Sequence, residues 1–224
     1  MVRLSQKLKS TASPGAPTGA AAAILDVAER LAQTLGYNGF SYADIAEQLG
    51  VTTPSLHYHF ATKAHLGSAL IERYHRAFSD ALTMIDTQTE EPSEKLHRYV
   101  DLYDSVLRND RMCLCGMLAA EYATLPAAMQ AGLTAFFDAN ERWLTAVLDG
   151  GVNSGAFVLA EPAKARARVL LGALEGAMLV ARSYRDASRF RSAATFLLAD
   201  LDRSGRRSEP TTKVKRTSGQ RRVR

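Results

Sequence analysis

The chain has little cysteine and no apolar segment long enough to cross a membrane. Its two cysteines, Cys113 and Cys115, lie two positions apart, which is too close for an ordinary framework disulfide. No apolar run approaches the roughly 18 residues that a membrane span requires. The first residues also lack the basic start and apolar stretch of a secretory signal. From these absences we expect a cytoplasmic protein with no membrane partner.

Strand patterns and familiar catalytic motifs are missing as well. No segment shows alternation of apolar and polar residues between hairpin turns, as half-buried β-strands do. The sequence also contains no G-x-S-x-G, no H-E-x-x-H, no P-loop and no clustered carboxylate pair. An enzyme acting on a small molecule in a helical pocket was the rival class, but no catalytic residue can be named for it. We therefore predict a protein that is not an enzyme, with no cofactor and no bound metal.

Positive charge is scarce outside the C-terminal end. The formal net charge is +5, yet residues 203–224 contain nine Lys or Arg and one Glu, so the rest of the chain carries a net charge of −3. Nucleic-acid binding must therefore rest on a motif and not on overall charge. The tail, residues 203–224, is predicted to be disordered; it either adds non-specific DNA affinity or has no role.

Apolar residues recur at helical spacing along almost the whole remaining sequence. After a Ser-, Pro- and Gly-rich arm, residues 1–18, the pattern predicts helices over about 24–35, 66–85, 96–107, 114–122, 126–148, 162–184 and 188–201. Gly150, Gly151 and Gly155 are expected to form a turn. The predicted fold is all-α: a three-helix helix-turn-helix DNA-binding domain (19–64), then a larger helical ligand-binding and dimerisation domain (65–202).

The helix-turn-helix prediction comes from two short helices between residues 41 and 60. Ser41 can cap the first helix, which Gly50 ends within two turns. Thr52 can cap the second, and Pro54 suits a first helical turn because its missing N–H costs nothing there. Two short helices joined by a glycine-centred turn must cross steeply, which is the geometry of the motif.

The second short helix has short or planar polar side chains on one side, namely Thr53, Ser55, Tyr58 and His59. Such groups can reach base edges and phosphates. His57 and His59 are not expected to bind a metal ion together, because residues two apart on a helix point in different directions. A short motif in isolation often arises by chance. The long amphipathic helices that flank this one favour the DNA-binding interpretation.

The same stretch resembles the DNA-binding region of the tetracycline-repressor (TetR/AcrR) family. The residues that match the family pattern without a gap are Ser41, Ile45, Ala46, Gly50, Val51, Thr52, Leu56, His59, Phe60, Lys63 and Leu66. The resemblance implies that Ser41, Tyr58 and Lys63 touch phosphates and that Thr53, Pro54 and Ser55 face the groove. Together with Tyr42, Thr52, His57 and His59, these are the predicted DNA-binding residues. One departure from the family pattern is that His57 stands where the family has Tyr, with Tyr58 one place later. Either residue is therefore a candidate for the phosphate contact of that tyrosine.

The resemblance also implies a homodimeric repressor that binds a palindromic double-stranded operator and is released by a small apolar effector. Dimerisation is expected through the last two helices, which carry apolar stripes. On one helix these are Leu170, Leu171, Leu174, Met178 and Leu179, beside Gly172, Ala173 and Gly176; on the other they are Phe190, Ala193, Ala194, Leu197, Leu198 and Leu201. The alternative is that these stripes pack within one protomer.

A ligand cavity is expected among the middle helices, although the same side chains can equally form plain core. The predicted ligand-binding residues are Tyr103, Met117, Glu121, Tyr122, Phe137, Trp143 and Met178. Glu121 is expected to orient a polar ligand group or to pair with Arg142 or Arg182.

The two cysteines support an alternative function as a sensor of oxidants or electrophiles. Cys113 and Cys115 follow Arg111 at the predicted start of a helix, and both features would lower a thiol pKa. Against this, cysteine is often simply a small buried apolar residue.

Overall fold

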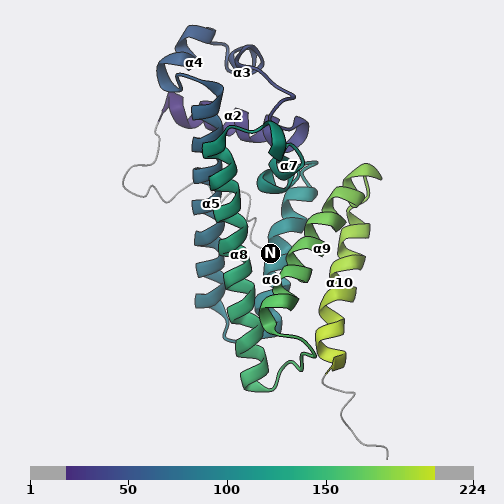
Figure 1. The fold of residues 1–224 in the computed structure, drawn as a ribbon. Helices are drawn as coiled ribbons and strands as arrows, with labels where there is room; N and C mark the ends of the chain where they lie inside the picture. Colours follow the sequence, from purple (N-terminus) through teal and green to yellow (C-terminus); the bar gives the residue numbers. More distant parts are fainter. Residues whose placement is uncertain (1–18, 205–224) are drawn as a thin grey trace, which may run out of the picture.

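The computed structural model describes residues 19–204, which fold into α-helices and one short 3₁₀ helix with no β-strand in that range (Figure 1). The predicted all-α fold is confirmed. The helices are α2 (Ala20–Leu35), α3 (Tyr42–Leu49), α4 (Thr53–His59), α5 (Lys63–Gln88), α6 (Pro92–Leu107), α7 (Leu114–Ala120), η1 (Tyr122–Thr124), α8 (Ala127–Ser154), α9 (Ala163–Ser183) and α10 (Ala187–Ser204). The predicted arm and most of the predicted tail lie outside the described residues. None of the described helices is both long and apolar enough to cross a membrane.

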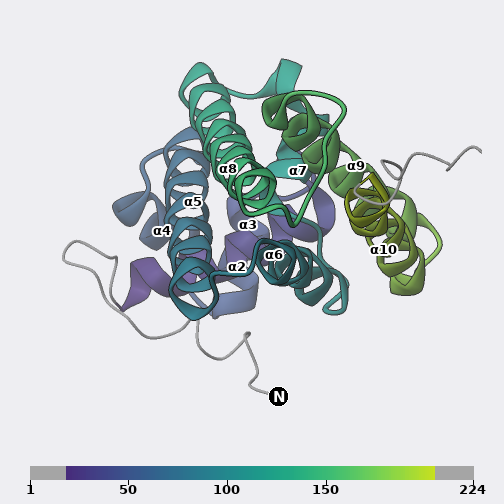
Figure 2. The same cartoon turned by 90° about the horizontal axis from the view of Figure 1, so that it is seen from below.

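The short helices α3 and α4 lie at one end of an elongated molecule, with α2 crossing beneath them (Figure 1). The long helices α5 and α8 run away from that end side by side, and α9 and α10 form the opposite side (Figure 2). A continuous apolar core runs from α2 to α10. The boundary predicted at residues 64 and 65 falls in the first turn of α5, which is one uninterrupted helix.

Aromatic rings fill the centre of the helical body. Phe136 of α8 is fully buried and meets the rings of Tyr74 and Phe78 from α5 at centroid distances of 5.6 and 5.3 Å. Tyr99 of α6 stacks on Trp143 of α8 at 5.4 Å. Such ring pairs add to the stabilisation from burying apolar area and hold α5, α6 and α8 together.

Two predicted helix ends differ from the structure. The helix expected over 114–122 ends at Ala120 and continues as η1. The helix expected to end near Leu148 runs on to Ser154, so Gly150 and Gly151 lie inside α8 and the turn falls at Gly155, where φ is 78°. A tertiary contact accounts for the longer helix. The Phe157 ring packs on Gly151, where any side chain would occupy the same space.

Most of the apolar stripes on α9 and α10 are buried within the protomer. Leu170, Leu171, Leu174, Met178, Phe190, Ala194, Leu198 and Leu201 belong to its own core, because α9 packs on α8 and α10 packs on α9 and α6. For these residues the alternative of packing within one protomer is correct. Leu179 is exposed, and Ala193 and Leu197 are half-buried.

The adjacent glycines of α8 provide a matched stability test. A Cβ at position 151 would lie 2.1 Å from the Phe157 Cδ2 atom, whereas one at position 150 meets nothing within 4 Å. Gly151→Ala should lower the free energy of unfolding by about 1–3 kcal/mol through overpacking. Gly150→Ala should raise it by about 0.5–1 kcal/mol, because alanine is the better helix former. Urea unfolding of both variants checks this, and equal effects of the two would contradict the packing described.

Candidate functional site

The α3–α4 pair is held at a fixed angle by its turn and by one buried side chain. Gly50 adopts the left-handed conformation, with φ 65° and ψ 33°, and the amide of Val51 donates to the Ala46 carbonyl oxygen at 3.1 Å. Leu56 of α4 is fully buried against the core. A left-handed residue at this point favours glycine, so the sequence permits the sharp reversal that the helix-turn-helix motif needs.

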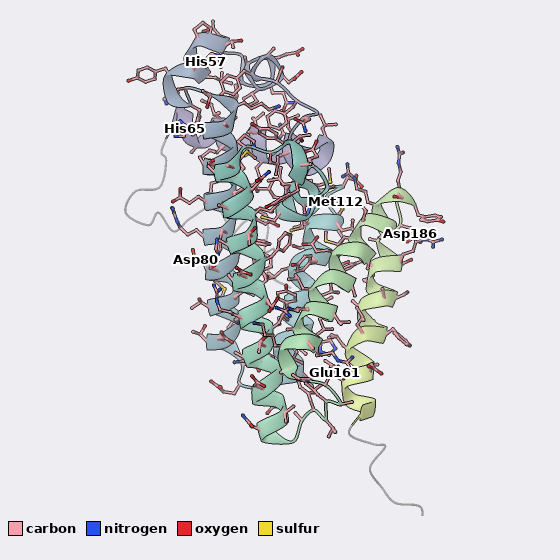
Figure 3. All side chains as sticks on the ribbon, viewed as in Figure 1. His57, His65, Asp80, Met112, Glu161 and Asp186 are labelled. Carbon is pink, nitrogen blue, oxygen red and sulfur yellow. The ribbon has the colours of Figure 1, made fainter. Side chains whose placement is uncertain are left out.

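The outer side of α4 is open to solvent at the tip of the molecule (Figure 3). Pro54, Ser55, His57 and Tyr58 are exposed, and the Tyr58 side chain is 87% accessible. Thr52, Thr53 and His59, also predicted as DNA-binding, lie on the same short segment; Thr52 is exposed and the other two are half-buried. This segment presents hydroxyl and imidazole groups together and contains no carboxylate.

Tyr42, also predicted as a DNA-binding residue, is not part of that exposed face. Its side chain is buried, and its hydroxyl donates to the Phe60 carbonyl oxygen at 2.7 Å. Its ring packs against the His57 ring at 4.6 Å, and burial raises the pKa of the hydroxyl to about 12. Tyr42 therefore positions the end of α4 relative to α3.

Lys63 also points inward, contrary to the phosphate contact that the resemblance implied. Its ammonium donates to the carbonyl oxygens of Tyr37 and Phe40 and lies over both rings, at 4.6 and 4.4 Å from their centroids. Burial lowers the pKa of this ammonium. Its contacts tie the first turn of α5 to the loop between α2 and α3.

Ser41 keeps its position at the start of α3, but its hydroxyl already has a partner. The hydroxyl and the amide of Ser41 both donate to the Asp44 Oδ2 atom at 2.7 Å, and these bonds lower the pKa of that carboxyl. Between residues 37 and 62 the sequence contains no Lys or Arg, and Asp44 and Glu47 are its acidic residues. This surface can therefore bind phosphates through hydroxyls, imidazoles and helix-terminal amides, without a lysine or arginine of its own.

Comparison with known proteins identifies the family. A sequence model of bacterial regulatory proteins of the tetR family matches residues 24–70. The solved structure of a TetR-family transcriptional regulator from Agrobacterium tumefaciens is 32% identical, covering 81% of this chain and 96% of that one, with a TM-score of 0.79. The chain belongs to the TetR family. It is a DNA-binding transcriptional regulator, with an N-terminal helix-turn-helix domain followed by a helical domain.

Further solved structures agree with this assignment. A TetR transcriptional regulator from Legionella pneumophila is 30% identical over 83% of this chain and 98% of that chain, with a TM-score of 0.76. A regulatory protein TetR from Rhodobacter sphaeroides is 21% identical, and at a TM-score of 0.74 over 80% of this chain and 96% of that one it shows the same fold. No curated protein sequence matches the chain.

The helical domain of this TetR-family protein is hydrogen-bonded to the end of α2 and to the residues that follow it. The amide of Met112 donates to the Gln33 carbonyl oxygen at 3.2 Å, and Arg182 of α9 donates to the Thr34 carbonyl oxygen. The carboxylate of Glu121 accepts the amides of Tyr37, at 2.5 Å, and Asn38, at 3.2 Å. Arg142 and Arg182, the partners expected for Glu121, form no ion pair with it. Its carboxylate accepts hydrogen bonds from the free amides after α2 instead.

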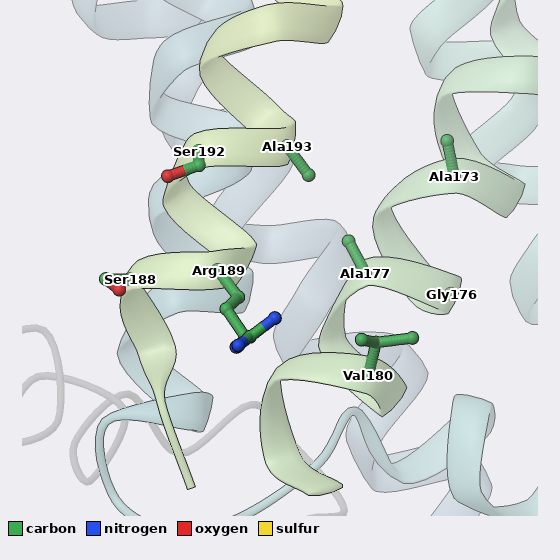
Figure 4. A pocket seen from close by; sticks show the side chains of 8 residues that line it. All are labelled: Ala173, Gly176, Ala177, Val180, Ser188, Arg189, Ser192 and Ala193. Carbon is green, nitrogen blue, oxygen red and sulfur yellow. The ribbon is translucent and has the colours of Figure 1, made fainter. Parts of the chain in front are cut away.

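The predicted ligand-binding residues are dispersed through the helical domain. Tyr103 and Met178 are buried in its core, and Met117, Phe137 and Trp143 are half-buried against it. The Trp143 indole N–H donates to Asp86 Oδ2 at 2.9 Å, and Tyr122 is exposed on η1. The structure does not bring them together around one cavity. It does contain an open groove between α9 and α10, lined by Ala173, Gly176, Ala177, Val180, Ser188, Arg189, Ser192 and Ala193 (Figure 4).

The cysteines lack the environment of reactive thiols. Cys113 and Cys115 are buried, and burial, followed by the negative charge of Glu175, raises the pKa of both thiols. The sequence predicts that Arg111 and a helix start lower these pKa values. That expectation is wrong, because loss of solvent outweighs both effects and keeps the thiols protonated.

Glu175, in the middle of α9, is a feature that the sequence analysis missed. Both of its carboxylate oxygens are buried, and within residues 19–204 neither has a nitrogen or oxygen donor; the only donor directed at them is the weak thiol of Cys113. Burial raises the pKa of this carboxyl to about 7, and the nearby Cys113 thiol partly offsets that rise. One signal could have revealed it: Glu175 is the only charged residue between Val169 and Val180.

Two tyrosines separate a structural role from a surface role. Tyr42→Phe removes a buried hydrogen bond and should lower the free energy of unfolding by about 1–2 kcal/mol. Tyr58→Phe should leave stability unchanged and weaken operator binding about fivefold, equivalent to about 1 kcal/mol for one phosphate contact. Thermal unfolding and gel retardation measure the two effects. The assignment fails if Tyr58→Phe unfolds earlier than the wild type.

The buried carboxylate predicts an unusual pH dependence of stability. The pKa of Glu175 is about 7 in the native state and 4.5 for an exposed glutamate, so the native state holds the proton more tightly. Stability should therefore fall as pH rises from about 4.5 and level off above about 7–8, with a total loss of up to about 3 kcal/mol.

Glu175→Gln should match the wild type near pH 4 and exceed it by up to about 3 kcal/mol at pH 8.5, because the amide is never charged. Urea unfolding at the two pH values checks this. The exposed Asp138 of α8 provides the control variant Asp138→Asn, which should show no such difference. Equal stability of Glu175→Gln and the wild type at both pH values would contradict the prediction.

Proposed function

We propose that this TetR-family regulator is a homodimeric repressor that occupies a palindromic operator and leaves it when a small, largely apolar effector enters the helical domain. The outward side of α4 carries this proposal, because its short polar side chains stand free at the tip of the molecule. Ser55 and Tyr58 are exposed and Thr53 is half-buried at the start of the helix, so we assign them to the major groove and its adjacent phosphates.

A dimer is needed because one short helix makes few base contacts. Two copies of α4 would have to lie about 34 Å apart to read successive major grooves on one side of the duplex. The support for a second copy is an unpartnered apolar face on α9 and α10. Its exposed side chains are Val169, Leu179, Val180, Tyr184 and Phe196. They flank the groove that contains Gly176 and Ala173, where small residues allow a partner helix to approach closely.

The contacts at the end of α2 provide a route from effector to DNA. Arg182 belongs to α9, a helix of the proposed dimer interface, yet it bonds to the Thr34 carbonyl oxygen of α2. A change in the packing of α7 and α9 would therefore move α2 relative to the partner protomer. An effector that binds the moved state more tightly would shift the population toward a wrong spacing of the two α4 helices.

A charged residue on the apolar face should separate the protomers and abolish specific binding. Val180→Glu should sediment as single chains and bind the DNA upstream of its own gene at least about a hundredfold more weakly, because the second half-site contact is no longer intramolecular. Met84→Glu is the control, since Met84 is also exposed but lies on α5. Wild-type protein that sediments only as single chains with DNA present, or whose shift disappears with competitor DNA, would overturn the proposal.

A further inference from the structure

Glu175 faces the interior of the helical domain, between α9 and α7. A Cβ built on Gly116 of α7 would lie 2.2 Å from its Oε2 atom, so the carboxylate lies directly against the backbone of α7. A side chain at position 116 would displace it. The glycine therefore provides the space that this carboxylate occupies.

No cation within residues 19–204 forms an ion pair with this carboxylate. The titratable groups that face it from the surrounding helices are Tyr74 of α5, Tyr99 and Tyr103 of α6, and Cys113 and Cys115 at the start of α7. All of these groups are neutral at pH 7, because burial raises the pKa of each phenol and thiol.

The Cys113 thiol, a weak donor, is directed at this carboxylate. The stronger donors nearby are committed elsewhere. The Tyr99 hydroxyl bonds to the Tyr103 hydroxyl at 3.1 Å and to Asn140 Oδ1 at 2.9 Å. Arg182, two turns further along α9, bonds to the Thr34 carbonyl oxygen and to Met117 Sδ. The buried carboxylate is thus surrounded by neutral groups and apolar side chains.

Burying a carboxylate without a partner is costly, so such groups are rare and are concentrated at functional sites. A ligand that carries positive charge and N–H donors would satisfy both oxygens at once. Among the described residues, no group of three His, Cys, Asp or Glu side chains is arranged to hold a metal ion, which favours an organic cation. The fully buried Met112 and Met178 lie in the same core, and their flexible thioethers can rearrange around an apolar body.

We propose that Glu175 is the anionic anchor of the effector site, and that the effector is a small apolar molecule bearing a protonated amine or amidine. This inference rests on the proposed function and specifies its ligand. The site adjoins α7, which is preceded by the Met112–Gln33 bond and followed by the Glu121–Tyr37 bond. A ligand that separates α7 from α9 therefore acts on the end of α2.

Matched probes test the charge requirement. Phenethylamine, its neutral counterpart phenethyl alcohol and the anionic phenylacetate are titrated into the full-length protein by calorimetry, without DNA. The amine should bind at least about tenfold more tightly than the alcohol, as expected for a charge-assisted hydrogen bond, and phenylacetate should not bind. Equal binding of amine and alcohol, or no binding of the amine at millimolar concentration, overturns the proposal.

Variants test the residue itself. Glu175→Gln keeps the shape of the side chain and should weaken amine binding at least about tenfold, while Asp138→Asn on the exposed side of α8 should leave it unchanged. Gly116→Ala should also weaken it, because its methyl group would overlap the carboxylate. Circular dichroism confirms that each variant is folded. Unchanged amine affinity in folded Glu175→Gln overturns the proposal.

The pH profile distinguishes an ionic anchor from a merely structural residue. The pKa of Glu175 is about 7. The amine stays protonated near neutral pH, as a lysine side chain does, so its affinity should rise about tenfold from pH 6 to pH 8. The profile of Glu175→Gln should be flat. A flat wild-type profile contradicts the ionic contact.

Gel retardation with the amine separates this proposal from the one that it rests on. If the protein binds DNA specifically but shows no charge-dependent amine binding, the proposed Glu175 site is wrong and the proposed function stands. If the protein binds the amine through Glu175 but does not bind DNA specifically, the proposed function is wrong and the amine site stands. If both hold, the amine should release the DNA from the wild type and not from Glu175→Gln.

Discussion

The junction between the end of α2 and the helical domain is the contact on which the rest of the molecule depends. Helix α2 ends at Leu35 and leaves carbonyl groups of its last turn free, and the amides of the residues after Gly36 also need partners once they are buried. Glu121 accepts the amides of Tyr37 and Asn38, and Arg182 donates to the Thr34 carbonyl oxygen. Glu121 precedes α8 in the sequence and Arg182 follows it. The orientation of the DNA-binding domain is therefore set by how the helical domain packs.

The exposed face of α4, the proposed DNA-binding surface, is built from polar groups with little charge. Lys63, for which the resemblance implies a phosphate contact, and Tyr42, predicted as a DNA-binding residue, stabilise the motif from inside. The exposed face is left with hydroxyls and imidazoles, whose hydrogen bonds depend on position and direction more than on long-range attraction. In the proposed dimer, affinity for DNA would come from accurate placement of two copies of this surface and from charges elsewhere in the chain.

The interior of the helical domain combines well-partnered polar groups with one that has no strong donor. Tyr99, Tyr103 and Asn140 satisfy each other in the core, as buried polar groups generally do. Glu175, close to the same network, keeps a carboxylate among neutral neighbours. The pKa of about 7 for this carboxyl follows directly from that environment, since loss of solvent penalises the charged form.

Local chemistry in the sequence determined the helices and the motif. Gly50 and Pro54 act on their own turns, and the apolar spacing of each helix is a local property, so these features were predicted correctly. The tertiary structure decided which polar side chains are free. Residues distant in the sequence provide the partners, or exclude the solvent, of Tyr42, Lys63, Glu121 and the two cysteines. The spacing of residues along one helix cannot predict such contacts. The same holds for Gly151, where Phe157 folds back on α8 and allows the helix to continue, and for Glu175, whose surroundings are formed by the three neighbouring helices α5, α6 and α7.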